Sequence, residues 1–347
     1  MEKMKALVKT GKGKGLVEIR EVPVPIAKEN EVLIKIKAVG VCGTDIHVYR
    51  DEMVYNPPVI LGHEFTGTIE AVEEKVKGWE KGERVIVEPH LGSCGICRFC
   101  RSGLIQLCPQ KKGPGWIIDG AMAEYIAVPY HLLHRVPDDM SDEEAGLAEP
   151  AAIVANALLD RNPIQAEELV VVLGPGPIGL LAAQIARAYG ARKVVLAGVD
   201  SDEALRLPLA RKLGIDYVVN SQKEDLPALV ADLSDGEGAD LVIEASGAEQ
   251  AINQAIDLVR INGRLSVIGI PTRERINVEW TKAVFKAINC DFSFSSSYQS
   301  WQRVVSMASR GLVDLKSLIT HQAPLEEWES VFKDLQEGRG VKALLLP

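Results

Sequence analysis

The chain lacks an excess of positive charge. Lysine and arginine number 39 against 48 aspartates and glutamates, which gives a formal net charge of -9 over 347 residues. This balance argues against an extended surface for nucleic acid or an anionic membrane, although small basic patches remain compatible with it. We therefore expect neither nucleic acid nor a membrane as a partner.

The chain also lacks a long uninterrupted hydrophobic run. Its most apolar stretch, LVVVLGPGPIGLLAAQIA, is broken by glycine and proline in its first half, whereas a membrane-spanning helix needs about 20 consecutive apolar residues. The first residues, MEKMKALVKTG, lack the apolar core of a secretory signal. We therefore expect a cytoplasmic protein, in which six cysteines are thiols or metal ligands before they are disulfides.

Two kinds of periodicity divide the chain, which is long enough for two cores. Residues 1 to about 140 contain short alternating strands such as EVLIKIKAVGV, and a helix is predicted in SDEEAGLAEPAAIVANALLD, where Ser141 and Glu144 form a capping box. From Leu169 onwards, apolar strands alternate with helices. This alternation predicts an α/β fold with a doubly wound parallel sheet that is covered on both faces.

A glycine-rich loop follows the first of these strands, in VVVLGPGPIG. Gly174 would make the tight turn, Gly176 would let the backbone approach a pyrophosphate, and Gly179 would let helix and strand pack closely. The helix N-terminus offers free N–H groups to the pyrophosphate. A glycine-rich turn without a ligand is the alternative, but the strand–loop–helix context favours a dinucleotide site.

The end of the second strand is unusual. An acidic residue about 20 residues after the loop normally binds the ribose 2′-hydroxyl of NAD, and Gly198 stands there instead. A glycine leaves room for the 2′-phosphate of NADP, yet Asp200 and two further carboxylates in the same turn would repel that phosphate. We predict NAD as the cofactor and keep NADP open.

Four cysteines occur within fifteen residues, in CGICRFCRSGLIQLC. Cys94, Cys97, Cys100 and Cys108 have the spacing C-x2-C-x2-C-x7-C. Four thiolates in one loop can surround a tetrahedral zinc ion completely, which makes a structural site. Two disulfides, a redox pair and an iron–sulfur cluster are the alternatives.

Together with CGTDIH, GHEFTG and LAEP, these motifs resemble the zinc-dependent medium-chain dehydrogenases, the family of alcohol, sorbitol and threonine dehydrogenases. The resemblance covers the whole chain in order. It implies a GroES-like, mostly β catalytic domain at residues 1–150 with the cysteine lobe at about 90–110. A Rossmann domain is expected at 151–291, and residues 292–347 are expected to return to the catalytic domain.

The resemblance implies a second, catalytic zinc ion per chain. Cys42 and His63 match its ligands, with Glu64 beside them, and Glu149 stands where other members have a second cysteine. One thiolate, one imidazole and carboxylate oxygens leave a position open for water or substrate. Which of Glu64 and Glu149 binds the resting metal stays open.

The resemblance also assigns roles in proton transfer. Thr44 matches the hydroxyl that hydrogen-bonds the substrate oxygen, His47 matches the histidine that passes the proton to solvent, and Asp45 matches the carboxylate that orients the histidine ligand. The site of the cofactor comprises the glycine loop and later strand ends, and we assign to it Gly174, Gly176, Pro177, Ile178, Gly179, Gly198, Asp200, Ser246, Gly247, Ile268 and Ile270.

The substrate is less clearly specified. By the same resemblance, Glu149 and the GHE turn place the chain with the polyol and threonine dehydrogenases rather than with the ethanol-type enzymes. We expect a polyol or another secondary alcohol first and L-threonine second, because FSFSSSYQSW lacks an arginine for the threonine carboxylate and the nearest is Arg303. Ser295 to Ser297 could hydrogen-bond polyol hydroxyls or form a polar loop. His90 precedes the cysteine lobe at a place where threonine dehydrogenases also have a histidine. It is equally well explained as a residue of the substrate pocket and as an ordinary loop residue.

Several weaker expectations complete the prediction. Cys290 lies in an apolar strand pattern and is expected to be a buried thiol. Relatives pair their cofactor-domain sheets edge to edge, so we expect a homo-oligomer, either a dimer or a tetramer.

Two alternative functions can be considered for this chain. A binding protein that has lost catalysis would lack a metal ligand, and a zinc-free reductase would lack the cysteine lobe and the GHE turn. Neither description fits this chain.

Overall fold

The computed structural model of the protein describes residues 2–347, which form two compact units. Of the described residues, the first unit contains 2–149, 304–309 and 319–347, and the second contains 150–303 and 310–318. The C-terminal return to the first unit thus begins at Val304, later than the expected residue 292. Hydrogen bonds from the Asn156 amide to Ser293 and Ser295 keep the intervening segment in the second unit.

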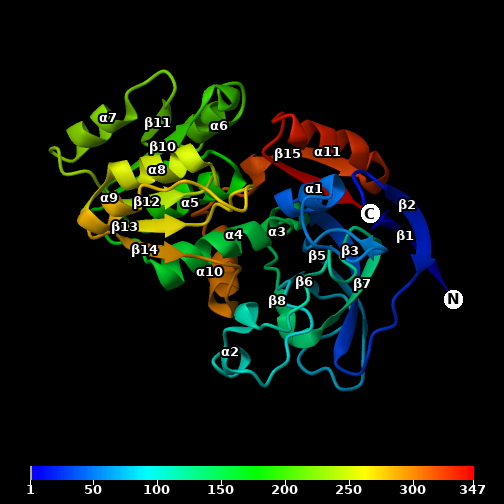
Figure 1. The fold of residues 1–347 in the computed structure, drawn as a ribbon. Helices are drawn as coiled ribbons and strands as arrows, with labels where there is room; N and C mark the ends of the chain where they lie inside the picture. The colour runs from blue at the N-terminus through cyan, green and yellow to red at the C-terminus, as the bar shows by residue number, and fades with distance from the viewer. Residues whose placement is uncertain (1) are drawn as a thin grey trace. The chain divides into compact units, whose positions relative to one another are not determined.

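The first unit is mostly β (Figure 1). Seven strands form one sheet, in the order β15-β16-β3-β5-β6-β8 with β7 paired to β3, and three form another in the order β2-β1-β4. The strands are β1 (Lys3–Lys9), β2 (Val17–Pro23), β3 (Glu31–Gly40), β4 (Val59–Ile60), β5 (Glu64–Val72), β6 (Arg84–Val87), β7 (Tyr125–Pro129), β8 (Leu133–Arg135), β15 (Ile319–Pro324) and β16 (Lys342–Leu346).

The first unit also contains four short helices: α1 (Gly43–Arg50), α2 (Arg98–Arg101), α3 (Asp142–Ala145) and α11 (Trp328–Gln336). The predicted capping box is confirmed at α3, where Ser141 Oγ accepts a hydrogen bond from the Glu144 N–H and the Glu144 carboxylate accepts one from the Ser141 N–H. The helices α4 (Ala148–Ala155) and α10 (Tyr298–Ser309) each begin in one unit and end in the other.

The second unit contains a six-stranded sheet in the order β11-β10-β9-β12-β13-β14, in which every pair is parallel. Its strands are β9 (Leu169–Leu173), β10 (Lys193–Gly198), β11 (Tyr217–Asn220), β12 (Ala239–Glu244), β13 (Val259–Val267) and β14 (Asn289–Phe292), and its helices are α5 (Pro177–Ala188), α6 (Arg206–Lys212), α7 (Leu226–Leu233), α8 (Glu249–Leu258) and α9 (Trp280–Phe285). This order is the doubly wound arrangement that binds dinucleotides, and it confirms the predicted fold class.

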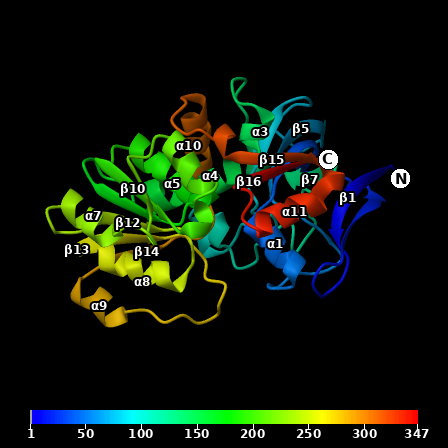
Figure 2. The same cartoon turned by 90° about the horizontal axis from the view of Figure 1, so that it is seen from above.

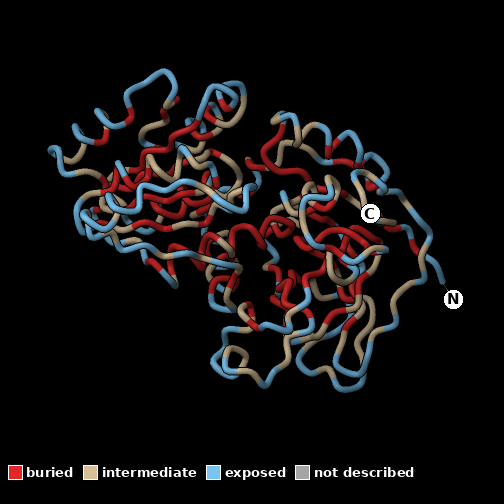
Figure 3. Tube along the Cα trace, viewed as in Figure 1, coloured by how far each residue is buried: buried red, intermediate tan, exposed pale blue. Residues whose placement is uncertain are grey.

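Helices cover both faces of this sheet, with α5 on one side and α8 on the other (Figure 2). Every residue of β9 is therefore buried, which explains its continuous apolar sequence. Buried residues follow the strands in both units, while connecting loops are exposed (Figure 3). Among the described residues, none of the helices combines the length and the apolar character that crossing a membrane would require.

The expectation for Cys290 is wrong. It lies on β14, at the edge of the six-stranded sheet, and is exposed. Its apolar neighbours Phe292 and Phe294 are 68% and 59% exposed. An apolar sequence predicts a buried strand only where other parts of the protein cover its side chains. The side chains of β14 are mostly exposed, although one edge of the strand pairs with β13.

Candidate active site and cofactor-binding loop

Cys42 stands directly before α1, where the chain leaves β3. Asp45, in the first turn of that helix, is 1% exposed and accepts two backbone hydrogen bonds. Its Oδ2 accepts the Cys42 N–H at 2.9 Å, and its Oδ1 accepts the Gly62 N–H at 3.1 Å. Asp45 thereby joins the turn that carries Cys42 to the turn that carries His63.

The GHE turn needs its glycine. Gly62 has a φ of +89°, and a Cβ there would lie 2.7 Å from Met122 Cγ. His63 follows, 5% exposed, with its Nδ1 4.0 Å from Asp45 Oδ1 and its ring edge-on to Trp116 at 5.2 Å between centroids. The next residue, Glu64, begins β5.

Cys42, His63 and Glu64 converge on one point, since their potential ligand atoms all lie within 4.8 Å of one another. His63 Nδ1 is buried without a hydrogen-bond partner among the described residues. Burial and, next, the negative charge of Glu64 raise the pKa of the Cys42 thiol. A divalent cation would relieve this crowding of buried donors and favour the thiolate, so the residues present fit a zinc ion.

Glu149 lies in the first turn of α4 and is 6% exposed. Burial, followed by the charge of Glu64, raises its pKa to about 7. The cluster within 4.8 Å comprises Cys42, His63 and Glu64 and leaves Glu149 out. Glu149 is therefore a charged neighbour of the three convergent donors, near enough to interact electrostatically with both His63 and Glu64.

Sequence reasoning missed Lys342. This residue lies on β16 and is 3% exposed, and its ammonium contacts the Glu64 carboxylate. Burial acts to lower the pKa of Lys342, but the charges of Glu64 and Cys42 outweigh it and the pKa is raised. No local motif marks this lysine, since it is nearly 300 residues from its partner. Only the pairing of β16 with β3 brings it to the site.

Thr44 and His47 lie on α1 with Cys42 at its start. The Cys42 thiol and the Thr44 hydroxyl are 3.7 Å apart. His47 is half-exposed, and its Nδ1 lies 2.8 Å from Oε2 of Glu52, which is also half-exposed. The start of α1 thus leads from the partly buried thiol to a histidine at the surface. Glu52 is a contact that sequence reasoning missed.

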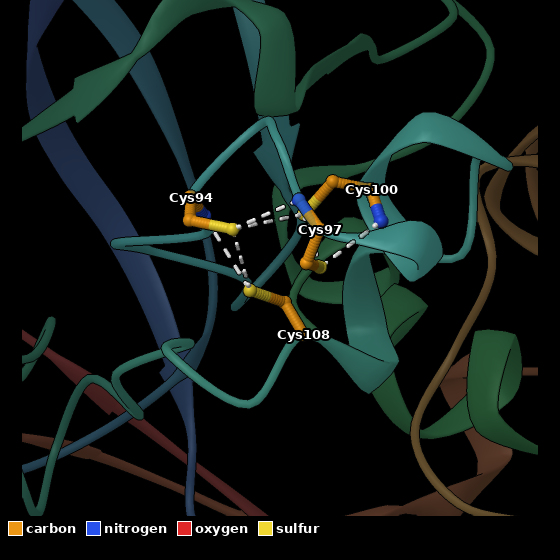
Figure 4. A group of neighbouring side chains, drawn as sticks. All are labelled: Cys94, Cys97, Cys100 and Cys108. Carbon is orange, nitrogen blue, oxygen red and sulfur yellow. Dashed lines mark hydrogen bonds between the residues drawn. The ribbon is translucent and has the colours of Figure 1, made fainter.

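The four cysteines of the lobe converge as the spacing predicted (Figure 4). Adjacent sulfur atoms are separated by 3.5 Å (Cys97–Cys100), 3.7 Å (Cys94–Cys108) and 4.0 Å (Cys94–Cys100). A tetrahedral zinc with Zn–S bonds of about 2.3 Å requires sulfur atoms roughly 3.8 Å apart. A disulfide needs about 2.05 Å, and all cysteines of the described chain are free.

Backbone N–H groups support thiolates in this lobe. The N–H groups of Cys94, Cys97 and Cys100 each donate to a cysteine sulfur at 3.4 Å. The first of these bonds is the main cause that lowers the pKa of Cys108 to about 6. The lobe therefore offers four sulfur atoms at the spacing of a closed, structural zinc site, with donors already directed at the sulfurs.

The glycine loop in the second unit has the geometry of a dinucleotide site. Gly174 follows β9 with a φ of +100°, and a Cβ on Gly179 would lie 1.8 Å from the Gly174 carbonyl oxygen. Around a Cβ on Gly176, by contrast, no atom of the described residues lies within 4 Å. Gly176 precedes Pro177 and Ile178 at the N-terminus of α5. Its open side is where a pyrophosphate can approach the backbone.

Two later loops come together beside Gly174. A Cβ on Gly174 would lie 2.8 Å from Ser246 Cβ, and one on Gly247 would lie 2.4 Å from the Ile270 carbonyl oxygen. Glu244, fully buried at the end of β12, joins these loops. Its side chain accepts hydrogen bonds from Ser246 and Gly247, and its carbonyl accepts the Ile268 N–H. Sequence reasoning missed Glu244, although it ends an apolar strand.

The structure shows that the space directly beside Gly198 is smaller than a glycine in the sequence suggests. A Cβ at this position would lie 2.8 Å from Pro175 Cγ and 2.9 Å from Asp202 Oδ2. The space beside Gly198 is therefore filled by the chain itself. Asp200 follows the strand with its side chain exposed, and it accepts a hydrogen bond from the Asn220 amide at 2.7 Å.

Other candidates have structural partners. His90 is fully buried, with its Nε2 3.6 Å from Glu88 Oε2, and it borders a cavity of about 800 Å³ whose lining includes neither Cys42 nor His63. His134 Nε2 contacts the same carboxylate at 2.8 Å. His90 thus belongs to a buried histidine–glutamate cluster in the first unit.

The serine run is also structural. Ser296 Oγ accepts the Trp301 indole N–H, and the Ser297 hydroxyl donates to Asp160. Arg303 forms an ion pair with the same aspartate at 3.0 Å. These groups hold the segment before α10 and are therefore already committed within the second unit.

Comparison with known proteins agrees with the description of the first unit and with that of the second unit. Residues 28–138 match the alcohol dehydrogenase GroES-like domain, and residues 177–310 match the zinc-binding dehydrogenase domain. The chain is 39% identical over 344 residues to sorbitol dehydrogenase of Halalkalibacterium halodurans, covering 99% of both chains. It is 35% identical to L-threonine 3-dehydrogenase of Anaeromyxobacter sp. (strain K), covering 99% of this chain and 98% of the relative.

A solved structure is similar over the whole length. It is a zinc-binding dehydrogenase from Sinorhizobium meliloti 1021 bound to NADP, with 28% identity, a TM-score of 0.92 and full coverage of both chains. Two matched domains and two full-length relatives above 30% identity agree with the convergent donors and the glycine loop described above. The chain belongs to the zinc-dependent medium-chain dehydrogenases and is a zinc-dependent, NAD(P)-linked oxidoreductase.

Proposed function

We propose that the protein oxidises a secondary alcohol, most specifically a polyol, to the corresponding ketone. The hydride passes to the nicotinamide of NAD(P)+ and the hydroxyl proton passes to solvent. The convergence of Cys42, His63 and Glu64 carries this proposal, because one thiol, one imidazole and one carboxylate leave a metal position free for a substrate oxygen. Zinc, when bound, supplies Lewis acidity that favours loss of the hydroxyl proton.

The residues around this group have distinct roles in the proposal. Cys42, His63 and Glu64 hold the metal, and Asp45 positions the turns that carry Cys42 and His63. The Thr44 hydroxyl accepts a hydrogen bond from the substrate hydroxyl and relays the proton, giving up its own proton as it takes up that of the substrate. His47 then releases a proton to solvent at the surface beside Glu52. Glu149 keeps a carboxylate near the donors and can replace Glu64 at the metal. The cysteine lobe holds the second zinc and stabilises its loop.

A polyol is favoured over an amino acid for two reasons. The relative with 39% identity is named a sorbitol dehydrogenase. A threonine substrate needs a cation for its carboxylate, and Arg303, the nearest arginine to the FSFSSSYQSW segment, is paired with Asp160. The serine hydroxyls lend no support to a polyol, because Ser296 and Ser297 have protein partners. L-threonine is the second candidate, since relatives with that name are 35% identical.

The experiment is a dehydrogenase screen on zinc-replete protein, which follows the absorbance of reduced nicotinamide. Sorbitol, xylitol, inositol, simple secondary alcohols and L-threonine are each combined with NAD and NADP. Turnover of a polyol with a kcat/KM at least about tenfold above that of L-threonine supports the proposal. Turnover of L-threonine alone contradicts it and requires a carboxylate-binding cation elsewhere.

We also propose that the exposed edge of the six-stranded sheet pairs with a second copy of this chain. β14 is the terminal strand, and its Phe292 is 68% exposed. On neighbouring α9, Trp280 and Phe285 are 70% and 83% exposed. Exposed aromatic residues beside an unpaired strand edge favour binding of another protein chain at that edge, here a second copy of this chain. Light scattering on the wild type should give at least a dimer, and Phe292→Lys should shift the mass toward the monomer.

A further inference from the structure

The end of β10 departs from the usual ribose site of a Rossmann fold. A carboxylate at this strand end normally accepts the ribose 2′-hydroxyl of NAD, while a nearby arginine serves the 2′-phosphate of NADP. Gly198 provides neither group. Family membership does not decide the matter, because one structural neighbour is bound to NADP.

The space that a side chain at position 198 would need is already taken. A Cβ on Gly198 would lie 2.8 Å from Pro175 Cγ, 2.9 Å from Asp202 Oδ2 and 2.9 Å from Leu207 Cδ2. Real Cβ atoms do not approach other atoms so closely, so neither aspartate nor glutamate fits at 198 without displacing its neighbours. The carboxylate in this place belongs to Asp202, four residues later.

The Asp202 carboxylate is held firmly. The residue is 4% exposed and ends the short 3-10 helix η4 (Asp200–Asp202). Its Oδ2 accepts the Val199 N–H at 3.0 Å, and its Oδ1 accepts from Arg206 Nη1 at 3.0 Å. Because a carboxylate oxygen can accept more than one hydrogen bond, Oδ2 can serve a ribose hydroxyl beside the Val199 N–H.

The cations of this turn are engaged with its carboxylates. Arg206 pairs with Asp202, and Lys223 contacts Glu203 at 2.5 Å and Asp200 at 3.6 Å. The three carboxylates of this turn are thus contacted by two cations, Arg206 from α6 and Lys223 from the segment after β11. A 2′-phosphate would add negative charge beside these carboxylates, and Arg206 and Lys223, the two cations that contact them, are already paired.

We propose that the protein prefers NAD to NADP and that Asp202, in place of residue 198, is the carboxylate that sets this preference. The proposal rests on the dinucleotide site of the proposed function. Asp202 accepts the ribose hydroxyl of NAD and repels the 2′-phosphate of NADP. Gly198 is the consequence of this arrangement, because only glycine leaves room for the Asp202 carboxylate against the strand.

The test measures binding without any alcohol substrate, so it is independent of the reaction. Isothermal titration calorimetry on the full-length, zinc-replete protein compares ADP-ribose with 2′-phospho-ADP-ribose. The wild type should bind ADP-ribose at least about tenfold more tightly. Asp202→Asn keeps an oxygen for the Val199 N–H and removes the charge, so it should reduce this ratio by about tenfold or more.

Asp232→Asn is the matched control, because it makes the same change of net charge at an exposed position of α7 and should leave the ratio unchanged. A wild type that binds the 2′-phosphorylated analogue equally or more tightly overturns the proposal, and this comparison needs no variant. An unchanged ratio in Asp202→Asn also overturns it, since Asp202 would then only close the turn. If neither analogue binds, the dinucleotide site itself is refuted together with this proposal. An inactive protein that still discriminates between the analogues supports the proposal and refutes only the substrate assignment.

Discussion

The Lys342 ammonium contacts the Glu64 carboxylate inside the first unit, where the two side chains are only 4% and 1% exposed. The contact joins the last strand of the chain to the residue that follows His63. A buried carboxylate without a counter-charge is strongly unfavourable. Lys342 therefore balances Glu64 whether or not the metal is bound, and a zinc ion would share this role.

Replacement of Lys342 by methionine should destabilise the protein, and more so without zinc. Loss of one partner of a buried ion pair lowers the free energy of unfolding by about 3 kcal/mol or more. The measurement is the melting temperature with and without a chelator. Lys342→Arg is the control, because it keeps the charge and should recover part of the stability. Equal melting temperatures for Lys342→Met and the wild type in chelator would show that the contact contributes nothing.

The two groups of metal donors should be separable by single substitutions. Cys42→Ser should abolish turnover and lower the metal content from two zinc ions per chain to one, since the structure has two such groups. Binding of the reduced dinucleotide, followed by fluorescence, should persist because the glycine loop belongs to the second unit. Full activity and two zinc ions in Cys42→Ser would remove Cys42 from the metal.

Cys100→Ser tests the lobe with the same chemical change. Its sulfur lies within 4.0 Å of two other cysteine sulfurs, so loss of this donor opens the site. The melting temperature should fall by about 5–10 °C as the loop loses its metal. Metal analysis should again find one zinc ion. An unchanged melting temperature with both zinc ions retained would refute a structural site in the lobe.

Two glycines of the cofactor loop should respond differently to alanine. Gly176→Ala places a methyl group in open space and should leave the melting temperature within about 1 °C. It should nevertheless weaken binding of reduced dinucleotide by about tenfold or more, because the methyl group occupies the approach of the pyrophosphate. Gly179→Ala, whose Cβ would meet the Gly174 carbonyl at 1.8 Å, should destabilise the fold itself. The reverse pattern would show that the roles of these two glycines are exchanged.

Local patterns explain why much of this molecule could be predicted. The strand–loop–helix at Gly174 and the cysteine spacing are short-range features, so the sheet class and the thiol cluster follow from neighbouring residues. Lys342 and Glu64 are brought together by the pairing of β16 with β3, and no short-range signal records that pairing. The space beside Gly198 could not be predicted for a related reason. A glycine in the sequence suggests free space, but the Asp202 side chain lies where a side chain at position 198 would begin. The burial of Cys290 was predicted wrongly because an apolar strand at the edge of a sheet has the same sequence pattern as a buried strand.

The route of the proton can be tested at the surface end of α1. His47→Asn should lower kcat at neutral pH by about 10- to 100-fold, because it removes the group that exchanges a proton with solvent. Glu52→Gln should have a smaller effect, about two- to fivefold, since it removes only a half-exposed partner of the His47 ring. Stopped-flow single turnovers at several buffer concentrations measure this step. Added imidazole should restore much of the rate in His47→Asn, while the exposed control His131→Asn should match the wild type without it. A His47→Asn protein with the wild-type rate, or one that imidazole fails to rescue, would exclude proton transfer through this histidine.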